Sequence, residues 1–212
     1  MKKIFNKNLK EKSRVWIQRQ LRDTYAQGAK KHNLRSRSAF KLIEIDKKFK
    51  FLKNNISLLD LGSAPGGWSL VASKKIKKGK ILAIDLMGMQ KIQNVRFILG
   101  NFLKDEIQKK IYEFFDGKID ALISDMATNT TGNKRLDSYR TNELCIGALE
   151  FSLKVLKKNG VFICKCLMGS EFKAIEQLAD TNFEQVIKFK PDSSRKESRE
   201  LYIYCKNVFK QL

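Results

Sequence analysis

The chain has 212 residues, of which 42% are hydrophobic and two are prolines, so it is long enough for one α/β domain with a buried core. It carries 43 lysines and arginines against 22 acidic residues, and the formal net charge of +21 indicates a polyanionic partner. The four cysteines form no C-x-x-C pair and the chain has one histidine, which argues against a zinc site or another metal site.

The excess of positive charge lies mainly in the first quarter of the chain. Residues 1–50 hold 16 of the lysines and arginines and four acidic residues, a net charge of +12, which favours a binding surface over a uniform compositional bias. Residues 1–12 are basic and polar, which predicts a mobile arm and not an apolar signal segment. No apolar run approaches the roughly 20 residues of a membrane span, so we expect a cytoplasmic protein without a membrane partner.

Two helices are predicted within this basic region. Apolar residues at helical spacing predict one amphipathic helix over residues 13–31. A second helix is predicted from Ser38, whose hydroxyl can cap it, to about Phe49. Trp16 and Tyr25 could stack on bases, but they lie on the apolar face of the first helix and suit the core equally well.

The central motif is LDLGSAPGGWS at residues 59–69, which is typical of a strand, a glycine turn and a helix. Glycines let the backbone approach a ligand closely, and the amides at the start of a helix are free donors, so the turn can hold a nucleotide cofactor. The motif lacks the middle glycine of the G-x-G-x-x-G fingerprint of dinucleotide-binding proteins. A simple link between strand and helix is the alternative. The candidate cofactor-binding residues of the turn are Gly62, Gly66, Gly67 and Trp68.

Two acidic residues lie beside this turn. Asp60 precedes it and could receive an ammonium group. Asp85 ends the next predicted strand, over residues 81–85, where a carboxylate is placed for a ribose diol. An acid for an amine and an acid for a ribose together suggest S-adenosyl-L-methionine as the cofactor.

The rest of the chain alternates strands and helices, which predicts a parallel sheet covered on both faces. The predicted strands cover residues 56–61, 81–85, 95–99, 119–124, 161–166, 185–189 and 201–205. The predicted helices cover residues 68–76, 105–114, 139–156 and 171–179. We expect a Rossmann-like α/β core over residues 51–212, of the methyltransferase type, whose last strand runs antiparallel between the fifth and sixth. We expect residues 1–50 to form a small basic helical extension of the same domain.

Three charged residues are predicted to meet at the edge of this sheet where the parallel strands end. Asp125 follows the fourth predicted strand, and Lys165 lies near the end of the fifth. An antiparallel last strand would begin at the same edge, which would place Glu200 beside Lys165. The site should lie there.

Several motifs occur in order along the chain: RSRSAFKL at 35–42, DLGSAPGGW at 60–68, SDMA at 124–127, Lys165, and KPDSSRKESRE at 190–200. Together they resemble the FtsJ/RrmJ family of ribose 2′-O-methyltransferases over nearly the whole chain. Within the family, the similarity is to the bacterial enzymes that methylate a uridine in the A loop of large-subunit rRNA. The resemblance therefore implies an RNA methyltransferase that acts on the large ribosomal subunit, with no obligate protein partner.

The resemblance implies a catalytic tetrad of Lys41, Asp125, Lys165 and Glu200. Lys165 would accept the proton of the ribose hydroxyl or, if it stays charged, would orient the hydroxyl by a hydrogen bond. Glu200 would hold Lys165, and Asp125 would link the cofactor to the lysines. Lys41 would orient the substrate or assist Lys165.

The family's cofactor contacts fall on Gly66, Trp68, Asp85, Asn101 and Asp125. Trp68 could instead only fill the core. Asn101 stands where the family usually has an acid, and its amide can both accept from and donate to an adenine.

Basic residues in two regions are the candidate contacts to RNA phosphates. One region is the N-terminal extension, and the other is a predicted loop after Asp125. A solvated charged surface would have the same composition. The candidate RNA-binding residues are Arg14, Arg35, Arg37, Lys134, Arg135 and Arg140.

Three other functions have similar sequence features. A tRNA anticodon-loop 2′-O-methyltransferase would carry nearly the same motifs. An inactive ribosome assembly factor could keep the fold, although the intact tetrad speaks against it. A small-molecule methyltransferase would not need the basic N-terminal region.

Overall fold

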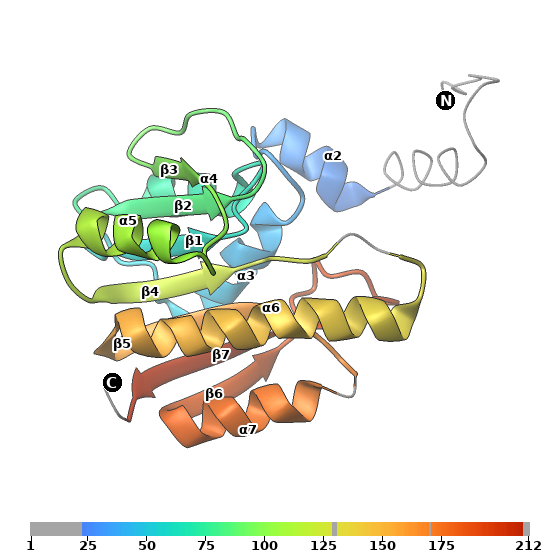
Figure 1. Ribbon diagram of the computed structural model, residues 1–212. Coiled ribbons are helices and arrows are strands. Elements are labelled where there is room, and N and C mark those ends of the chain that lie inside the picture. Colours follow the sequence, from blue (N-terminus) through green and yellow to red (C-terminus); the bar gives the residue numbers. More distant parts are fainter. Residues whose placement is uncertain (1–22, 129–130, 170, 210–212) are drawn as a thin grey trace.

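The computed structural model describes residues 23–128, 131–169 and 171–209 (Figure 1). The strands are β1 (Leu58–Leu61), β2 (Ile81–Asp85), β3 (Arg96–Leu99), β4 (Ile119–Ser124), β5 (Leu156–Leu167), β6 (Phe183–Phe189) and β7 (Glu200–Val208). The helices are α2 (Thr24–Lys31), α3 (Ala39–Phe49), α4 (Gly67–Lys75), α5 (Asp105–Phe115), α6 (Lys134–Val155) and α7 (Phe172–Asn182). The predicted arm over residues 1–12, together with Arg14 and Trp16, lies outside the described residues.

All of these strands form one sheet in the order β3-β2-β1-β4-β5-β7-β6. The ladders from β3 through β5 are parallel, and β7 pairs antiparallel with both β5 and β6. The prediction of a mostly parallel sheet whose last strand lies between the fifth and sixth is therefore confirmed. This order brings the ends of β4 and β5 and the start of β7 to one edge of the sheet.

Helices cover both faces of the sheet (Figure 1). α5, α6 and α7 pack on one face, where their apolar residues join β1, β4 and β5 in a buried cluster. α3 and α4 pack on the other face, and the second cluster includes residues of both helices. Each face of the central strands is buried, which explains why β1 consists of buried residues throughout.

The predicted continuous helix over residues 13–31 is interrupted at Asp23, which is extended and caps α2. Residues 13–22 of that prediction lie outside the described residues. One carboxylate oxygen of Asp23 accepts the amides of Tyr25 and Ala26. The predicted cap of α3 is also wrong: the Ser38 hydroxyl contacts the Ser36 hydroxyl at 2.8 Å and caps no amide.

The long helix α6 begins five residues before the predicted start. Asn133 caps it, since its side chain accepts the amides of Arg135 and Leu136. The basic stretch after Asp125 was expected to be a loop, and this expectation is wrong. Lys134, Arg135 and Arg140 lie in the first turns of α6, where they are exposed.

The cysteines, the helices and the metal-ligating side chains can be compared with what the sequence indicates. The four cysteines are free and buried. None of the described helices is both long enough and apolar enough to cross a bilayer. No cluster of metal-ligating side chains was found in the part of the chain that the structure describes.

Candidate active site

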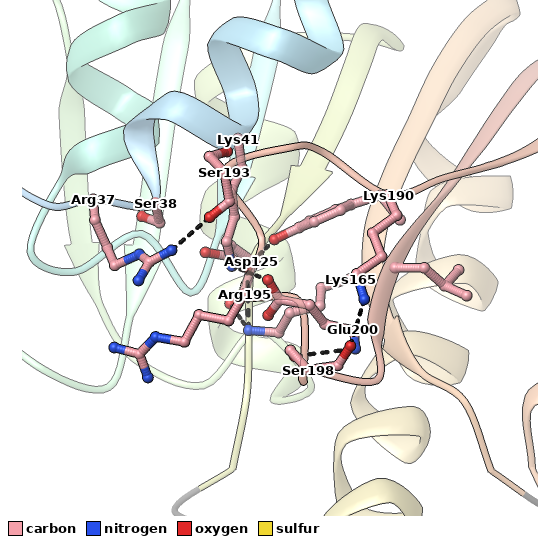
Figure 2. A network of polar contacts seen from close by, with 12 residues as sticks. Arg37, Ser38, Lys41, Asp125, Lys165, Lys190, Ser193, Arg195, Ser198 and Glu200 are labelled. Carbon is pink, nitrogen blue, oxygen red and sulfur yellow. Dashed lines mark hydrogen bonds and ion pairs between the residues drawn. The ribbon is translucent and has the colours of Figure 1, made fainter. Parts of the chain in front are cut away.

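Four charged side chains meet at the edge where the parallel strands end (Figure 2). Lys165 of β5 lies with its Nζ 2.7 Å from the backbone oxygen and 3.1 Å from Oδ1 of Asp125. Lys41 comes from the first turn of α3, and its Nζ lies 2.8 Å from Oε1 of Glu200 and 3.7 Å from Oδ1 of Asp125. The four side chains therefore lie together, as expected from the sequence, and their catalytic roles stay predictions.

The partner of Glu200 differs from the prediction. Glu200 was expected to hold Lys165, but its carboxylate pairs with Lys41. The register explains the difference, because Lys165 lies opposite Tyr202 on β7 and Glu200 lies opposite Leu167, two positions further along β5. A lysine in the first turn of a helix is disfavoured by the helix dipole, and the two carboxylates offset this cost for Lys41.

Tyr202 completes the cluster and was not predicted from the sequence. Its hydroxyl donates a 2.6 Å hydrogen bond to Oδ1 of Asp125, and its ring lies 5.6 Å from Nζ of Lys41. The ring also packs against Trp68, with 5.6 Å between the centroids. Tyr202 is two residues after Glu200 on a strand, so the spacing of two could have revealed that both share one face.

The surroundings of Asp125 favour its charged form. Burial alone would raise the pKa of Asp125, but Lys165 and Lys41, together with the hydrogen bond from Tyr202, lower it below its usual value. Asp125 is therefore ionised at neutral pH. It provides one negative charge shared by two lysines.

The glycine turn forms the neighbouring wall of the site. Gly62 and Gly66 have φ angles of +72° and +100°, which other residues rarely adopt. A Cβ on Gly62 would lie 2.2 Å from Cγ of Met126, so a larger residue there would force Met126 to move. Gly67 begins α4, and amides at the start of a helix have no partner within the helix, so this turn can offer donors to a ligand.

Two further candidate cofactor residues end the adjacent strands. The carboxylate of Asp85 accepts the amides of Ala64 in the turn and of Met87, each at 2.8 Å, which fixes its orientation. Asn101 follows β3, and its Oδ1 accepts the amide of Leu103 at 3.0 Å. That contact leaves the NH₂ group of Asn101 as a donor for a base. The cofactor roles of both residues remain predictions.

Leu86 and Met87 were missed by the sequence analysis. Both follow Asp85, and each is 71% exposed, which is unusual for two adjacent large apolar side chains. Their position beside the ribose-binding candidate suits contact with the flat face of an adenine. The sequence feature that could have identified them is the pair of apolar residues directly after Asp85, the acid that ends β2.

Trp68 and Arg35 have structural contacts that bear on their predicted roles. The Trp68 ring is 2% exposed and its Nε1 donates to the backbone oxygen of Ser38, so the side chain fills the core beside the site. The Arg35 guanidinium donates to the backbone oxygens of Pro65, Gln90 and Lys91. Arg35 therefore holds the glycine turn against the β2–β3 connection, and its contact with RNA stays a prediction.

Asp60 is buried, with its Oδ2 accepting a 2.6 Å hydrogen bond from Ser69. Burial raises the pKa of Asp60 to about 7 despite this bond. Its predicted contact with the ammonium group of the cofactor remains untested.

Asp60→Asn is expected to stabilise the cofactor-free protein at alkaline pH. The folded state holds a proton on Asp60 that the unfolded state has lost between about pH 4 and 7, so wild-type stability falls across this window as pH rises. Asparagine does not titrate, so the free energy of unfolding of Asp60→Asn should exceed that of the wild type by an amount that grows to the order of 2–4 kcal/mol at pH 8. Urea unfolding at pH 5 and pH 8 measures it, with Asp120→Asn as control, because Asp120 is a partly exposed acid that pairs with Lys157. An advantage of Asp60→Asn that did not change with pH would contradict a buried, titrating Asp60.

A family profile matches most of the chain. The profile of the FtsJ-like methyltransferases aligns with residues 34–208, which include the glycine turn, the charged cluster and every strand. The chain belongs to the FtsJ-like methyltransferase family. Membership confirms the predicted type of enzyme and, with it, S-adenosyl-L-methionine as the methyl donor.

Individual FtsJ-like relatives agree with this assignment. A Pelagibacter ubique protein named ribosomal RNA large subunit methyltransferase E is 47% identical over 194 residues, covering 92% of this chain and 96% of that protein. A Rickettsia akari protein of the same name is 44% identical over 198 residues, covering 91% and 87%. The crystal structure of a Plasmodium falciparum protein described as a ribosomal RNA methyltransferase has a TM-score of 0.75 and 37% identity, covering 82% of this chain and 98% of that chain. The FtsJ-like methyltransferase fold is thus confirmed.

Proposed function

We propose that the protein transfers the methyl group of S-adenosyl-L-methionine to the 2′-hydroxyl of a uridine in large-subunit rRNA. The target is the A loop of the assembled large ribosomal subunit. The observation that carries the proposal is the cluster of Lys41, Asp125, Lys165 and Glu200 beside the glycine turn. The names of the relatives from Pelagibacter and Rickettsia support an rRNA target.

The chemistry demands alignment and removal of one proton. S-adenosyl-L-methionine, when bound, supplies a methyl group that is already a good electrophile. A ribose hydroxyl is a poor nucleophile at neutral pH, so the protein must place its oxygen in line with the methyl carbon and take up its proton. In the reaction an oxygen–carbon bond forms and a carbon–sulfur bond breaks.

Lys165 is the proposed proton acceptor. Its Nζ contacts two oxygens of Asp125, the backbone oxygen at 2.7 Å and Oδ1 at 3.1 Å. A neutral amine that donates its two N–H groups to these oxygens has one lone pair left for the hydroxyl proton. Asp125 thereby fixes the direction of the lone pair. Lys41, held by Glu200, lies 3.7 Å from the same Oδ1 of Asp125 and would orient the ribose.

One copy of the chain carries every group in this mechanism, so we expect the monomer to be active. The exposed basic residues Lys134, Arg135 and Arg140 in the first turns of α6 are proposed contacts for RNA phosphates outside the centre. Action on ribosomal subunits agrees with the cytoplasmic location expected from the sequence.

Labelled S-adenosyl-L-methionine is expected to transfer its methyl group to large ribosomal subunits that lack the A-loop methylation. The comparison includes the matching naked rRNA and bulk tRNA. Digestion of the labelled RNA to nucleosides should yield 2′-O-methyluridine from subunits only, if the substrate is the assembled particle. Label in tRNA alone would replace the rRNA target with a tRNA. No label anywhere, with the cofactor still bound, would contradict methyl transfer to RNA and favour an assembly factor.

A further inference from the structure

Asp23 joins three separate segments beside the active site. One of its carboxylate oxygens caps α2 through the amides of Tyr25 and Ala26. The other pairs with Nη1 of Arg37, in the turn before α3, and lies 3.5 Å from Nη2 of Arg195. The Asp23 side chain is 9% exposed, so this carboxylate is largely committed to these contacts.

Arg195 lies in the loop over residues 190–199, which we call the β6–β7 loop. This loop leads directly into Glu200 at the start of β7. The backbone of Ser193 in the loop is held from both sides, because its oxygen accepts from Nη2 of Arg37 at 2.5 Å and its amide donates to both carboxylate oxygens of Glu44. The position of the loop relative to α3, and therefore to Lys41, is fixed by these contacts.

Both arginines line a pocket of about 360 Å³ that opens beside the catalytic cluster. Lys41 and Glu200 of the cluster line the same pocket, together with Glu197 and Ser198. Figure 2 shows the guanidinium groups of Arg37 and Arg195 extending to the same side of the network, away from Lys165. A group bound between them would be the neighbour of whatever reacts at the cluster.

The net charge and the hydrogen-bond donors of Asp23, Arg37 and Arg195 suit the binding of one phosphodiester. Two guanidinium groups and one carboxylate have a net charge of +1, which matches the single negative charge of an RNA linkage. Each guanidinium has five N–H donors in a planar fork, more than the contacts with Asp23 and Ser193 use. Planar forks of this kind bind two oxygens of one phosphate.

We propose that Asp23 positions Arg37 and Arg195 as a paired site for the RNA phosphate that flanks the reacting ribose. Asp23 is then a positioning residue, which acts through the two arginines and does not touch the reacting atoms. The inference rests on the proposed RNA substrate and adds the place where its backbone is held. Arg195 and Asp23 were not among the residues that the sequence identified.

Two substitutions separate the positioning role from other effects. Asp23→Asn keeps an oxygen for the cap of α2, since asparagine caps helices about as well as aspartate, but it removes the ion pairs. Loss of a negative charge would by itself strengthen the attraction of RNA. If Asp23→Asn binds RNA more weakly, the cause is therefore the lost orientation of the two arginines and not the lost charge. Arg195→Ala leaves the cap and the Asp23–Arg37 pair intact.

The test measures kcat and KM for methyl transfer to large ribosomal subunits that lack the methyl group. We expect KM to rise about fivefold in Asp23→Asn and about tenfold in Arg195→Ala, with kcat within about twofold of the wild type, because binding and not the chemical step is affected. Binding of the A-loop RNA fragment at several salt concentrations gives a second readout. Loss of one phosphate contact in Arg195→Ala should make the slope of log K against log salt shallower by about 0.7.

Glu176→Gln is the matched control, because Glu176 pairs with Lys188 on the outer part of the sheet at 2.6 Å. It removes one negative charge, as Asp23→Asn does, but Glu176 lies on α7 and does not line the pocket, so KM should not rise and the salt slope should stay unchanged. An unchanged KM in both test variants, or tighter substrate binding by Asp23→Asn, would overturn the proposal. If the wild type labels no RNA, the proposed function fails, whereas the salt slopes of RNA binding still decide whether the paired site exists.

Discussion

Lys165→Ala is expected to lower the rate of methyl transfer by about 10³-fold, within the range measured when a general base is lost. Cofactor affinity should stay within about twofold, because the contacts of Lys165 Nζ are with Asp125 and not with the glycine turn. An interaction that is used only in the transition state lowers kcat without changing ground-state binding. Single-turnover transfer to ribosomal subunits and calorimetric titration with S-adenosyl-L-methionine measure the two quantities.

Lys188→Ala provides the control for this substitution. Lys188 is 57% exposed and forms an ion pair with Glu176, so its loss removes a lysine without disturbing the site. Both variants should unfold cooperatively, which thermal unfolding checks. Equal losses of turnover and of cofactor affinity in Lys165→Ala would contradict the assignment of Lys165 as the proton acceptor.

Asp125→Asn should lower both activity and stability. Oδ1 of Asp125 contacts Lys41 and Lys165 and accepts the hydroxyl of Tyr202, so the substitution disturbs three neighbours at once. We expect a loss of about 10³-fold in turnover, because Lys165 is no longer oriented. The free energy of unfolding should fall by about 2 kcal/mol near pH 7, since a hydrogen-bonded charge with buried partners is lost.

The pH dependence of this stability difference has a definite sign. The pKa of Asp125 is lowered in the folded state, so its stabilising contribution is present above the unfolded value of about 4 and is lost as pH falls through the folded value. The wild type should therefore exceed Asp125→Asn in stability by a constant amount above about pH 5, and by less below pH 4. Urea unfolding from pH 3 to pH 8 measures this difference. A difference that grew toward low pH would show that Asp125 is not held in its charged form.

The sheet and the members of the cluster could be predicted because they follow from local patterns. β2 and β4 have the predicted bounds, since short apolar runs ending in Asp85 and Asp125 mark them clearly. Alternation of strands and helices then determines which edge carries the strand ends. Lys165 and Asp125 are adjacent for this reason, and the register of β4 with β5 confirms it.

The missed features depend on contacts between segments that are distant in sequence. Glu200 pairs with Lys41 because of the register of β7 with β5, which no local pattern reveals. The apolar spacing of the sequence continues through Asp23, but α2 begins only after this residue. The Asp23 side chain caps α2 and pairs with Arg37, which holds Asp23 outside the helix. Tertiary contacts outweigh helical periodicity at such a position.

The ion pairs within the cluster of Lys41, Asp125, Lys165 and Glu200 also affect which part of an RNA can enter the site. Two lysines and two carboxylates balance each other in the cluster, so its four side chains offer no excess of positive charge. The protein as a whole has a charge of +21, so RNA is drawn to its surface, but a phosphate gains nothing by entering the centre. An uncharged ribose faces no such barrier. We therefore expect the charged linkages of the RNA to stay at the rim of the site, while one uncharged sugar enters it.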